Sequence, residues 1–192
     1  MKQVPRSFFA RDSRIVAPEL LHKLLVRGDR VGRIVEVEAY AGTEDPASHG
    51  FRGPTPRNEV MFGPAGHLYV YFTYGMHFCA NAVCGHVGES SAVLLRAVAP
   101  LAGLDQMRAA RGPAARRDRD LCSGPAKLCQ AFAIDRALDG VDLVQGEAVG
   151  VFDDGTPPPT TPGVSPRIGI AVAVEAPWRW FVPGDPNLSR SR

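Results

Sequence analysis

Apolar and polar positions alternate between Gly32 and Tyr40, and this period of two predicts a half-buried β-strand. The two faces of the strand consist of Val35, Val37 and Ala39 on the apolar side and Glu36, Glu38 and Tyr40 on the other. A polar loop, residues 42–48, follows the strand and leads to His49. Two carboxylates and a phenol on one face are also typical of a solvated strand edge, but a loop that returns His49 over the strand end favours a chemical site.

The same alternation predicts a hairpin over residues 68–81, with tyrosines on its first strand. Its tip is the segment Tyr74-Gly75-Met76, because glycine supplies the positive φ angle that a tight turn needs. With three residues in the turn, Tyr69 pairs with Asn81, and Asn81 lies on the same face as Tyr71; a two-residue turn would place it on the opposite face. We expect the three-residue turn, since only this register lets both side chains line one pocket.

The remaining pattern predicts short helices and further strands around these two segments. Helices are expected at 18–25, 101–111 and 123–132, further strands at 92–98, near 147–152, at 167–174 and at 178–182, and surface loops at 50–67 and 84–91. Residues 1–17 predict an arm with an extended turn at 13–16. No regular βαβ repeat is present, so we expect a single α+β domain over residues 1–192, with a curved, mostly antiparallel sheet flanked by helices, a protruding β-hairpin, and loose termini at 1–6 and 184–192.

Arg96 is the one charged residue in the otherwise apolar segment 92–98. Burying an unpaired charge is costly, so Arg96 needs either a carboxylate partner or an anionic ligand. Pairing with a glutamate is the simplest expectation, and it is compatible with a place in an active site.

Two segments suit phosphate groups. The segment Arg111–Asp120 holds four arginines and two aspartates, and such a run either is a solvated face or follows a phosphate backbone. Ser123 is the expected N-cap of a helix whose first turn has free N–H groups, and Gly124 and Lys127 favour an anion there. An ordinary helix cap would explain Ser123 equally well.

Composition excludes some classes of protein but identifies none. The 192 residues are 45% hydrophobic and 22% charged, with a formal net charge of +2, as in ordinary globular proteins. Nearly all positive charges are arginines, which either suit phosphate or reflect a codon bias. The four cysteines, at 79, 84, 122 and 129, match no zinc spacing. No secretory signal or membrane-spanning run is apparent, so we expect reduced thiols in a cytoplasmic, nucleoid-associated protein.

Several common catalytic motifs are missing from the sequence. It contains no Gly-rich phosphate loop, no Gly-x-Ser-x-Gly elbow and no cluster of metal ligands. These absences remove kinases, dehydrogenases, serine hydrolases and zinc deaminases from the leading hypotheses. What remains is acid–base chemistry by a carboxylate beside side chains that can stack on a nucleobase.

Six motifs occur in an order and spacing that resemble the alkyladenine (3-methyladenine) DNA glycosylase family, from about residue 7 to residue 182. They are residues 33–40, 55–58, 68–71, 74–76, 94–97 and 121–129. The resemblance implies a monofunctional glycosylase of base excision repair, which flips an alkylated or deaminated purine out of double-stranded DNA. It then hydrolyses the N-glycosidic bond and leaves an abasic site. The family uses no metal and no organic cofactor, and we expect a monomer that does not bind membranes.

The resemblance also assigns roles by position. Glu38 resembles the general base that activates a water molecule, and Arg96 resembles the residue that helps to hold that water and a nearby phosphate. The other assigned residues are the pocket walls Tyr40, His49 and Tyr71 with the guanine-excluding Asn81, the intercalating Tyr74 and Met76, and the DNA-backbone contacts Thr55, Arg57, Ser123, Gly124 and Lys127. Two features depart from the family pattern: His77 stands where relatives often have an aromatic residue, and the loop 84–91 is longer than in some relatives.

Two other functions fit parts of the sequence. A non-catalytic protein that binds damaged nucleic acid would keep the stacking pocket, but the presence of both Glu38 and Arg96 argues against it. A hydrolase of small glycosides would use Glu36 and Glu38 as a carboxylate pair. Neighbours on one strand face lie side by side, however, whereas such enzymes flank the scissile bond from opposite sides.

Overall fold

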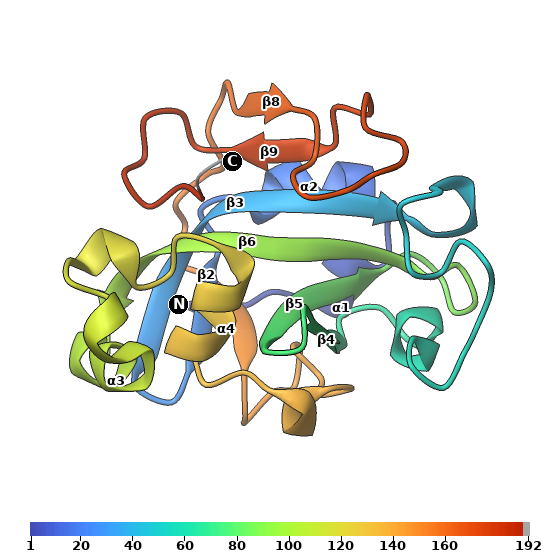
Figure 1. Cartoon of the computed structure of the whole chain (residues 1–192). Helices are drawn as coiled ribbons and strands as arrows, with labels where there is room; N and C mark the ends of the chain where they lie inside the picture. The colour runs from blue at the N-terminus through green and yellow to red at the C-terminus, as the bar shows by residue number, and fades with distance from the viewer. Residues whose placement is uncertain (190–192) are drawn as a thin grey trace.

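The computed structural model describes residues 1–189, and within them nine strands form one sheet in which every strand pair is antiparallel. The strands are β1 (Lys2–Gln3), β2 (Leu24–Arg27), β3 (Arg30–Ala41), β4 (Leu68–Thr73), β5 (His77–Cys84), β6 (Ser91–Ala102), β7 (Gly150–Asp153), β8 (Gly163–Ser165) and β9 (Arg179–Phe181). Their order is β1-β7-β2-β3-β6-β5-β4, with β9 paired to β3 and β8 paired to β9. This arrangement confirms the single α+β domain with a curved antiparallel sheet (Figure 1).

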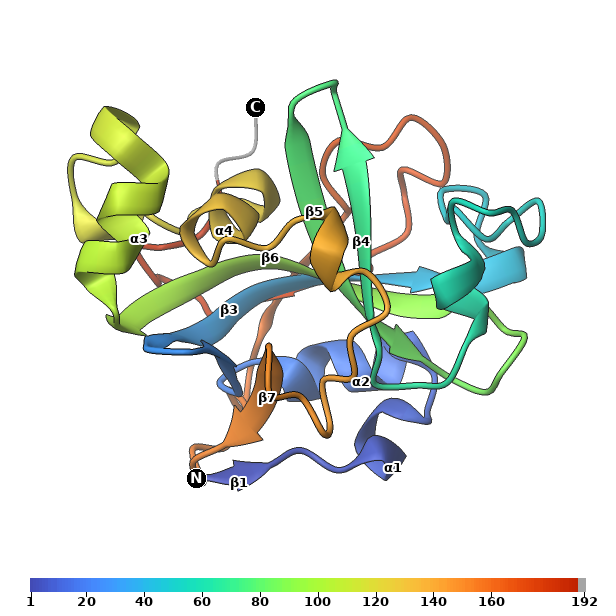
Figure 2. The same ribbon diagram turned by 90° about the horizontal axis from the view of Figure 1, so that it is seen from below.

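Short helices lie on both sides of the sheet. They are the α-helices α1 (Arg6–Phe9), α2 (Ser13–Leu20), α3 (Leu104–Arg111) and α4 (Pro125–Ala131), and the 3₁₀ turns η1 (Gly42–Glu44), η2 (Glu59–Phe62), η3 (Gly112–Ala114), η4 (Asp118–Asp120) and η5 (Arg136–Leu138). Figure 2 shows α3 and α4 on one side of the long strands β3 and β6, and α1 and α2 on the other. Among residues 1–189, no helix has the length and apolar character needed to cross a bilayer.

Strands β3 and β6 form the centre of the sheet, and an irregularity in their pairing shapes the core. The register shifts on both sides of Glu36, which is typical of a β-bulge. As a result Ile34, Val37 and Ala39 join the main core, while Val35 is buried outside that cluster. The expected strand is therefore present, but its apolar face does not follow strict alternation.

The hairpin of β4 and β5 has the expected register. Tyr69 pairs with Asn81 and Thr73 pairs with His77, so three residues form the turn. The N–H of Met76 donates to the carbonyl of Thr73 at 3.2 Å and closes this turn. The hairpin protrudes from the sheet beside α4, as Figure 2 shows. The prediction that Tyr71 and Asn81 share one face is confirmed. Asn81 lies directly opposite Tyr69, and Tyr71 follows Tyr69 by two positions on the same strand, so all three side chains point to one face.

The predicted helix at 18–25 is wrong. The helix α2 begins at Ser13, because the Asp12 side chain caps it by accepting a hydrogen bond from the N–H of Arg14 at 2.7 Å. Residues 24–27 form β2 between β3 and β7. Leu24 and Leu25 are buried, as the leucine pattern predicts, but sheet pairing rather than local helix propensity decides the conformation of residues 24–27.

Both ends of the chain are bound to the sheet, contrary to the expected loose termini at 1–6 and 184–192. Strand β1 pairs with β7, and Val4 is buried. At the other end Ser189 is buried and donates two hydrogen bonds to Glu36. The last residues of the second range, 190–192, lie outside the described residues.

Three other predicted elements differ from the structure. The helix expected at 101–111 begins at Leu104, because β6 continues to Ala102. The strand expected near 147–152 is Gly150–Asp153. The strand expected at 167–174 is not formed; residues 166–178 are a loop, whose place in the molecule is described below.

Candidate active site

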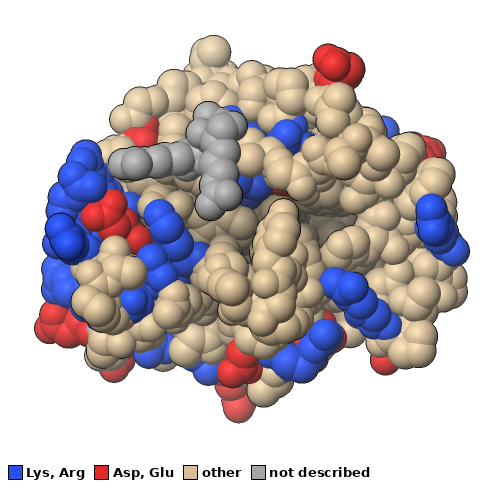
Figure 3. All heavy atoms as spheres, in the orientation of Figure 1, with Lys and Arg blue, Asp and Glu red and all other residues tan. Residues whose placement is uncertain are grey.

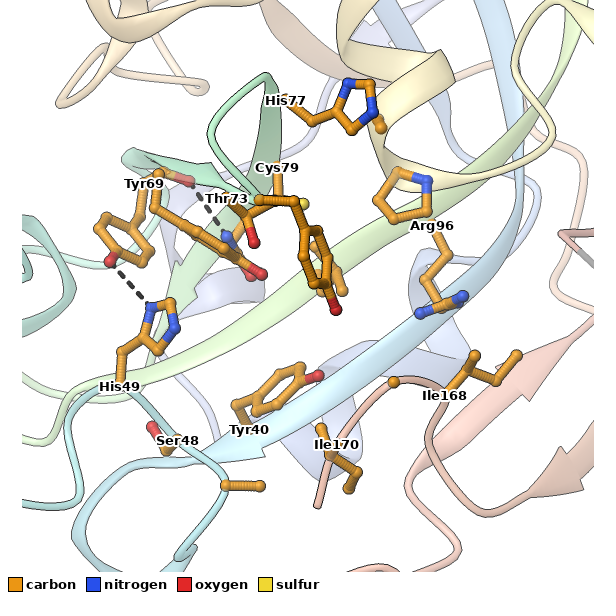
Figure 4. Close-up of a pocket in the computed structure, with 18 of the residues that line it drawn as sticks. Tyr40, Ser48, His49, Tyr69, Thr73, His77, Cys79, Arg96, Ile168 and Ile170 are labelled. Carbon is orange, nitrogen blue, oxygen red and sulfur yellow. Dashed lines mark hydrogen bonds between the residues drawn. The ribbon is translucent and has the colours of Figure 1, made fainter. Parts of the chain in front are cut away.

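A cavity of about 980 Å³ opens between the hairpin, the end of β3, the start of α4 and the loop 168–172. Figure 4 shows labelled side chains from all sides of it: His49 and Tyr69 face Arg96 and Ile168 across the space, with Tyr40 below. The sequence-predicted residues that line it are Tyr40, His49, Tyr71, Tyr74, Asn81 and Arg96. The structure therefore brings together residues that lie as far as 56 positions apart in the sequence, from Tyr40 to Arg96.

Three aromatic rings form one wall of the cavity. The ring centroids of His49 and Tyr71 are 4.4 Å apart at an interplanar angle of 75°, and those of Tyr69 and Tyr71 are 5.6 Å apart at 29°. The Tyr69 hydroxyl lies 3.0 Å from Nδ1 of His49, within hydrogen-bond distance. Tyr69 had no assigned role, although strand alternation already placed it on the face of Tyr71.

The titrating groups of this wall are held in their neutral forms. Desolvation in the cavity, and next the positive charge of Arg57, lower the pKa of His49. Burial raises the pKa of Tyr69 to about 12, and it also raises the pKa of Tyr71. At neutral pH the wall therefore presents uncharged rings.

Asn81 is buried and held against the neighbouring strand. Its Nδ2 donates to the backbone carbonyl of Tyr69 at 3.2 Å, across the pair that sets the hairpin register. The side chain lines the cavity in this position. Hairpin register and amide orientation are thus fixed by the same residue pair.

The carboxylate of Glu38 is fully buried and lies just behind the lining of the cavity. Its Oε1 accepts a hydrogen bond from the N–H of Ile168 at 2.7 Å and forms an ion pair with Nη1 of Arg96 at 3.0 Å. Its Oε2 accepts a hydrogen bond from the Tyr40 hydroxyl at 3.0 Å. Burial, and next the neighbouring carboxylate, raise the pKa of Tyr40 well above its ordinary value, so the hydroxyl keeps its proton and donates. All three residues that contact Glu38 in this way line the cavity.

Glu36, two positions earlier, has a different environment. Its Oε1 accepts from Nε of Arg96 at 2.8 Å, Nε of Arg179 at 2.7 Å and Oγ of Ser189 at 2.6 Å, and its Oε2 accepts from the N–H of Ser189 at 2.6 Å. Burial acts to raise the pKa of Glu36, but the Arg96 charge and the hydrogen bonds from Ser189 and Arg179 outweigh it, so the pKa is lowered. Glu36 therefore stays ionised and holds the C-terminal segment to the floor.

The two glutamates differ in their partners. Glu36 accepts four hydrogen bonds, one each from Arg96 and Arg179 and two from Ser189, whereas Glu38 accepts two among the described residues, from Tyr40 and Ile168. Of the partners of Glu36 only Arg96 lines the cavity, whereas all the residues that contact Glu38 do. Glu38 is thus the carboxylate more closely associated with the cavity. Arg96 contacts both glutamates, so its expected carboxylate partner is present twice.

The hairpin tip lies at the mouth of the cavity. Tyr74 is 79% exposed and adopts a φ angle of 51°, and Met76 is 69% exposed. Figure 3 shows a hollow beside a ridge of uncharged residues, with lysines and arginines gathered over α3 and again on the opposite side. His77, which departs from the family pattern, is also exposed and lines the same mouth.

The five expected DNA-backbone residues lie in two separate places. Arg57 is exposed and its Nη2 donates to the carbonyl of Phe72 at 3.1 Å, which places its guanidinium beside the hairpin. Thr55, also exposed, donates its hydroxyl to Oδ1 of Asn58 at 2.9 Å and so shapes that loop. The other three lie at the start of α4, on the far side of the hairpin.

At the start of α4 the predicted cap is wrong. Gly124, with a φ angle of 139°, occupies the N-cap position, and no side chain caps the helix. Ser123 instead accepts a hydrogen bond from Nζ of Lys127 at 3.2 Å. Pro125, in the first turn, lines the cavity, so Ser123, Gly124 and Lys127 lie close to its edge.

The loop Ile168–Val172 is the wall that sequence reasoning missed. Its alternating small and branched residues predict a strand, but Gly169 has a φ angle of 79° and the chain bends around the cavity. This bend aims the N–H of Ile168 at Glu38. A glycine inside an apparent strand was the available signal, because it often marks a bulge or a bend.

Among residues 1–189, no group of three or more His, Cys, Asp or Glu side chains is arranged to hold a metal ion. The four cysteines are buried and reduced.

The comparisons with known proteins agree with this chemistry. The model of the family "Methylpurine-DNA glycosylase (MPG)" matches residues 7–186. A protein of Burkholderia lata, named "Putative 3-methyladenine DNA glycosylase", is 58% identical over 188 residues, which cover 97% of this chain and 90% of the relative. Relatives with the same name from Streptomyces avermitilis and Carboxydothermus hydrogenoformans are 48% and 46% identical, each over 97% of this chain and over 91% and 98% of their own lengths.

Proposed function

The chain belongs to the methylpurine-DNA glycosylase family, and from this premise we propose that it excises damaged purines from duplex DNA by hydrolysing the N-glycosidic bond. The observation that carries the proposal is a buried carboxylate, Glu38, whose contacting residues Tyr40, Arg96 and Ile168 all line an aromatic cavity. A purine that reaches its chemistry inside a duplex has to leave the base stack. The cavity and the exposed hairpin tip suit these two needs.

Tyr74 and Met76 offset the cost of extruding the base. Extrusion costs a few kcal/mol, least for a damaged or poorly paired base, and stacking on an aromatic ring returns about 1–3 kcal/mol per base. Tyr74 is exposed at the mouth of the cavity, where its ring can occupy the vacated stack. Met76, exposed beside it, adds apolar contact to the neighbouring bases.

The neutral walls select an alkylated purine, which is cationic. The electron-rich faces of Tyr40 and Tyr71 attract a cation. The lowered pKa of His49 keeps the imidazole uncharged, so it does not repel the positively charged base. Asn81, held by its bond to the Tyr69 carbonyl, excludes guanine by a clash with the exocyclic amino group.

Glu38 acts as the general base. A water molecule in the cavity donates a hydrogen bond to Glu38, and the carboxylate accepts a proton as the water attacks the sugar C1′. Arg96 lies against Glu38 and the cavity, where it holds this water and a nearby phosphate. The negative carboxylate also stabilises the oxocarbenium charge that develops on the sugar.

The DNA backbone lies over both sides of the cavity mouth. Thr55 and Arg57 contact phosphates on one side of the hairpin, and Ser123, Gly124 and Lys127 contact them on the other. These contacts position the duplex but do not read its sequence, in keeping with lesion recognition that depends on the flipped base.

One assay tests the function. The protein is incubated with duplex oligonucleotides that each carry a single lesion, and we expect abasic sites without strand cleavage. Glu38→Gln should bind the lesion duplex but release the base about 10²–10⁴-fold more slowly. A protein that only binds damage would form no abasic site in the wild-type reaction, and a hydrolase of small glycosides would leave the duplex intact but cleave a free nucleoside.

A further inference from the structure

A second buried ion pair lies behind the cavity, between Arg167 and Asp45. Arg167 and Asp45 are both fully buried, and neither lines the cavity. Their contact is bidentate, with Nη1 to Oδ2 at 2.5 Å and Nη2 to Oδ1 at 2.9 Å. The sequence alone indicates no connection between them, since 122 positions separate the two residues.

Asp45 organises the turn that leads from β3 to His49. Its Oδ2 accepts from the N–H of Ala41 at 3.3 Å, and its Oδ1 accepts from the N–H of Ala47 at 3.0 Å. The carboxylate thus holds both ends of the turn, with Arg167 on its other side.

Arg167 organises the floor from behind. Its Nη1 also donates to the carbonyl of Ala39 at 3.0 Å, and its guanidinium carbon lies 4.7 Å from the centroid of the Tyr40 ring. The next residue, Ile168, donates its N–H to Glu38, and Tyr40 donates its hydroxyl to the other oxygen. Both hydrogen-bond donors to Glu38 are therefore set by contacts of Arg167 or by its adjoining peptide.

Stability alone gives a weak reason for this pair. Two buried charges are often replaced by apolar residues of similar volume at no cost, because desolvation cancels the attraction. Nε of Arg167 is buried without a hydrogen-bond partner among the described residues, a further cost. What the pair does supply is a defined geometry for three segments that meet at the cavity: the end of β3, the turn before His49 and the loop after Arg167.

We propose that Arg167 and Asp45 are positioning residues for base excision: they hold the Glu38 carboxylate and the Tyr40 ring in the orientation that the reaction needs. This proposal rests on the proposed function, because it assigns the two residues an effect through Glu38. Neither residue touches the substrate. Loss of the pair should therefore slow the chemical step and leave lesion binding almost unchanged.

The test variant is the double substitution Arg167→Met/Asp45→Asn. Methionine and asparagine remove both charges together, so no lone charge is buried, and the asparagine oxygen still accepts a backbone N–H. We expect the single-turnover excision rate to fall about 10²-fold, the effect of a small displacement of a catalytic group. The dissociation constant for lesion DNA, measured with the same duplex, should stay close to the wild-type value.

Two further variants separate positioning from general damage to the fold. Arg167→Lys keeps the charge opposite Asp45 but loses the planar fork, so its excision rate should lie between those of the wild type and the double variant. In the Glu38→Gln background, the double substitution should have no additional effect on residual excision of a cationic lesion, because its effect passes through Glu38. A structural role would instead lower binding and excision together in every background.

A control pair with a similar bonding pattern lies outside the cavity lining. Arg6 and Asp142 are joined at 2.5 Å, and Asp142 also accepts from the N–H of Val144 at 2.8 Å, much as Asp45 accepts from its own turn, although this pair is partly exposed rather than buried. Arg6→Met/Asp142→Asn should leave excision at the wild-type rate. Circular dichroism and thermal unfolding of all variants show whether each is folded.

The outcomes distinguish this inference from the proposed function. If the double variant excises at the wild-type rate while Glu38→Gln is inactive, the positioning role is wrong and the function stands. If the wild type releases no base, or Glu38→Gln turns over normally, the proposed function itself fails. Should the double variant not fold, Arg167→Lys decides: wild-type excision by this variant contradicts the inference, and a slower chemical step with unchanged binding supports it.

Discussion

The floor of the cavity and the tip of the hairpin have opposite physical character. At the floor, Glu36, Glu38 and Arg96 are buried and share a dense set of hydrogen bonds with residues from distant parts of the chain. At the tip, Tyr74 and Met76 are exposed, and Tyr74 adopts a positive φ angle. A catalytic carboxylate needs a fixed orientation, which burial and many partners supply. A residue that inserts into DNA has to be accessible before the partner arrives, so exposed apolar surface is retained there.

The comparison predicts that substitutions at the floor change chemistry or folding, whereas substitutions at the tip change binding. Each of the following experiments tests this difference between the floor and the tip, beginning with the substitution that should have the largest effect.

Glu38→Gln should lower the single-turnover excision rate by about 10²–10⁴-fold, the usual contribution of a general base. Glutamine has a single acceptor oxygen, so it keeps the bond from only one of Tyr40 and Ile168, and it cannot take a proton from water. Binding to lesion DNA should persist, which separates the chemical step from recognition. Undiminished turnover would remove Glu38 as the base.

Glu36→Gln should destabilise the fold more than Glu38→Gln does. It leaves Arg96 and Arg179 with less compensating charge in a buried site, and breaking a buried pair costs about 3–5 kcal/mol. Urea unfolding of the two variants measures the difference, with Glu38→Gln as the control on the same strand face. Equal unfolding midpoints would show that the two glutamates do not differ in structural role.

Tyr74→Ala should weaken binding of a lesion duplex by an amount that corresponds to about 1–3 kcal/mol, the loss of one stacking contact. Because the side chain is 79% exposed, the free energy of unfolding should not change. The fluorescence of 2-aminopurine placed beside the lesion reports flipping during binding. A signal identical to that of the wild type would contradict the insertion of Tyr74.

Acidification should affect cationic lesions first, through His49. Its pKa in the folded protein is lowered, so the imidazole is neutral at pH 7 and becomes charged only below its ordinary range near 6.5. The charged form repels a cationic base, so excision of 3-methyladenine should decline relative to that of a neutral lesion as the pH falls through that lowered value. The same sign applies to folding: a depressed pKa contributes stability above the unfolded-state pKa that is lost on acidification. A constant ratio of the two rates between pH 7 and pH 5 would exclude this role, and His49→Gln is the matched control.

Local periodicity predicted the parts of the fold that depend on neighbouring residues in sequence. The strand around Glu38, the strands of the hairpin and the shared face of Tyr71 and Asn81 all follow from alternation and from the length of one turn. Where the pattern was ambiguous it led to errors. Leu24 and Leu25 fit a helix or a strand, and the loop after Arg167 resembled a strand because its apolar residues alternate.

The candidate site likewise has features that the sequence predicted and features that it could not predict. Residue types and order were sufficient to indicate a carboxylate beside stacking rings, and a family resemblance singled out Glu38 from Glu36. Alternation alone could not do so, because both side chains share one strand face. The tertiary structure distinguishes them by their partners: Glu36 accepts hydrogen bonds from Arg179 and Ser189, which lie far from it in the sequence.

The sequence by itself therefore determined the periodic strands and the chemical types at the site, whereas the three-residue turn was expected only because it lets Tyr71 and Asn81 line one pocket. Only the tertiary structure decided which groups are desolvated, which donors reach each carboxylate and which charges meet. Asp45 and Arg167 show the physical reason, because burial and hydrogen-bond saturation depend on contacts between segments 122 positions apart. No local pattern records such contacts.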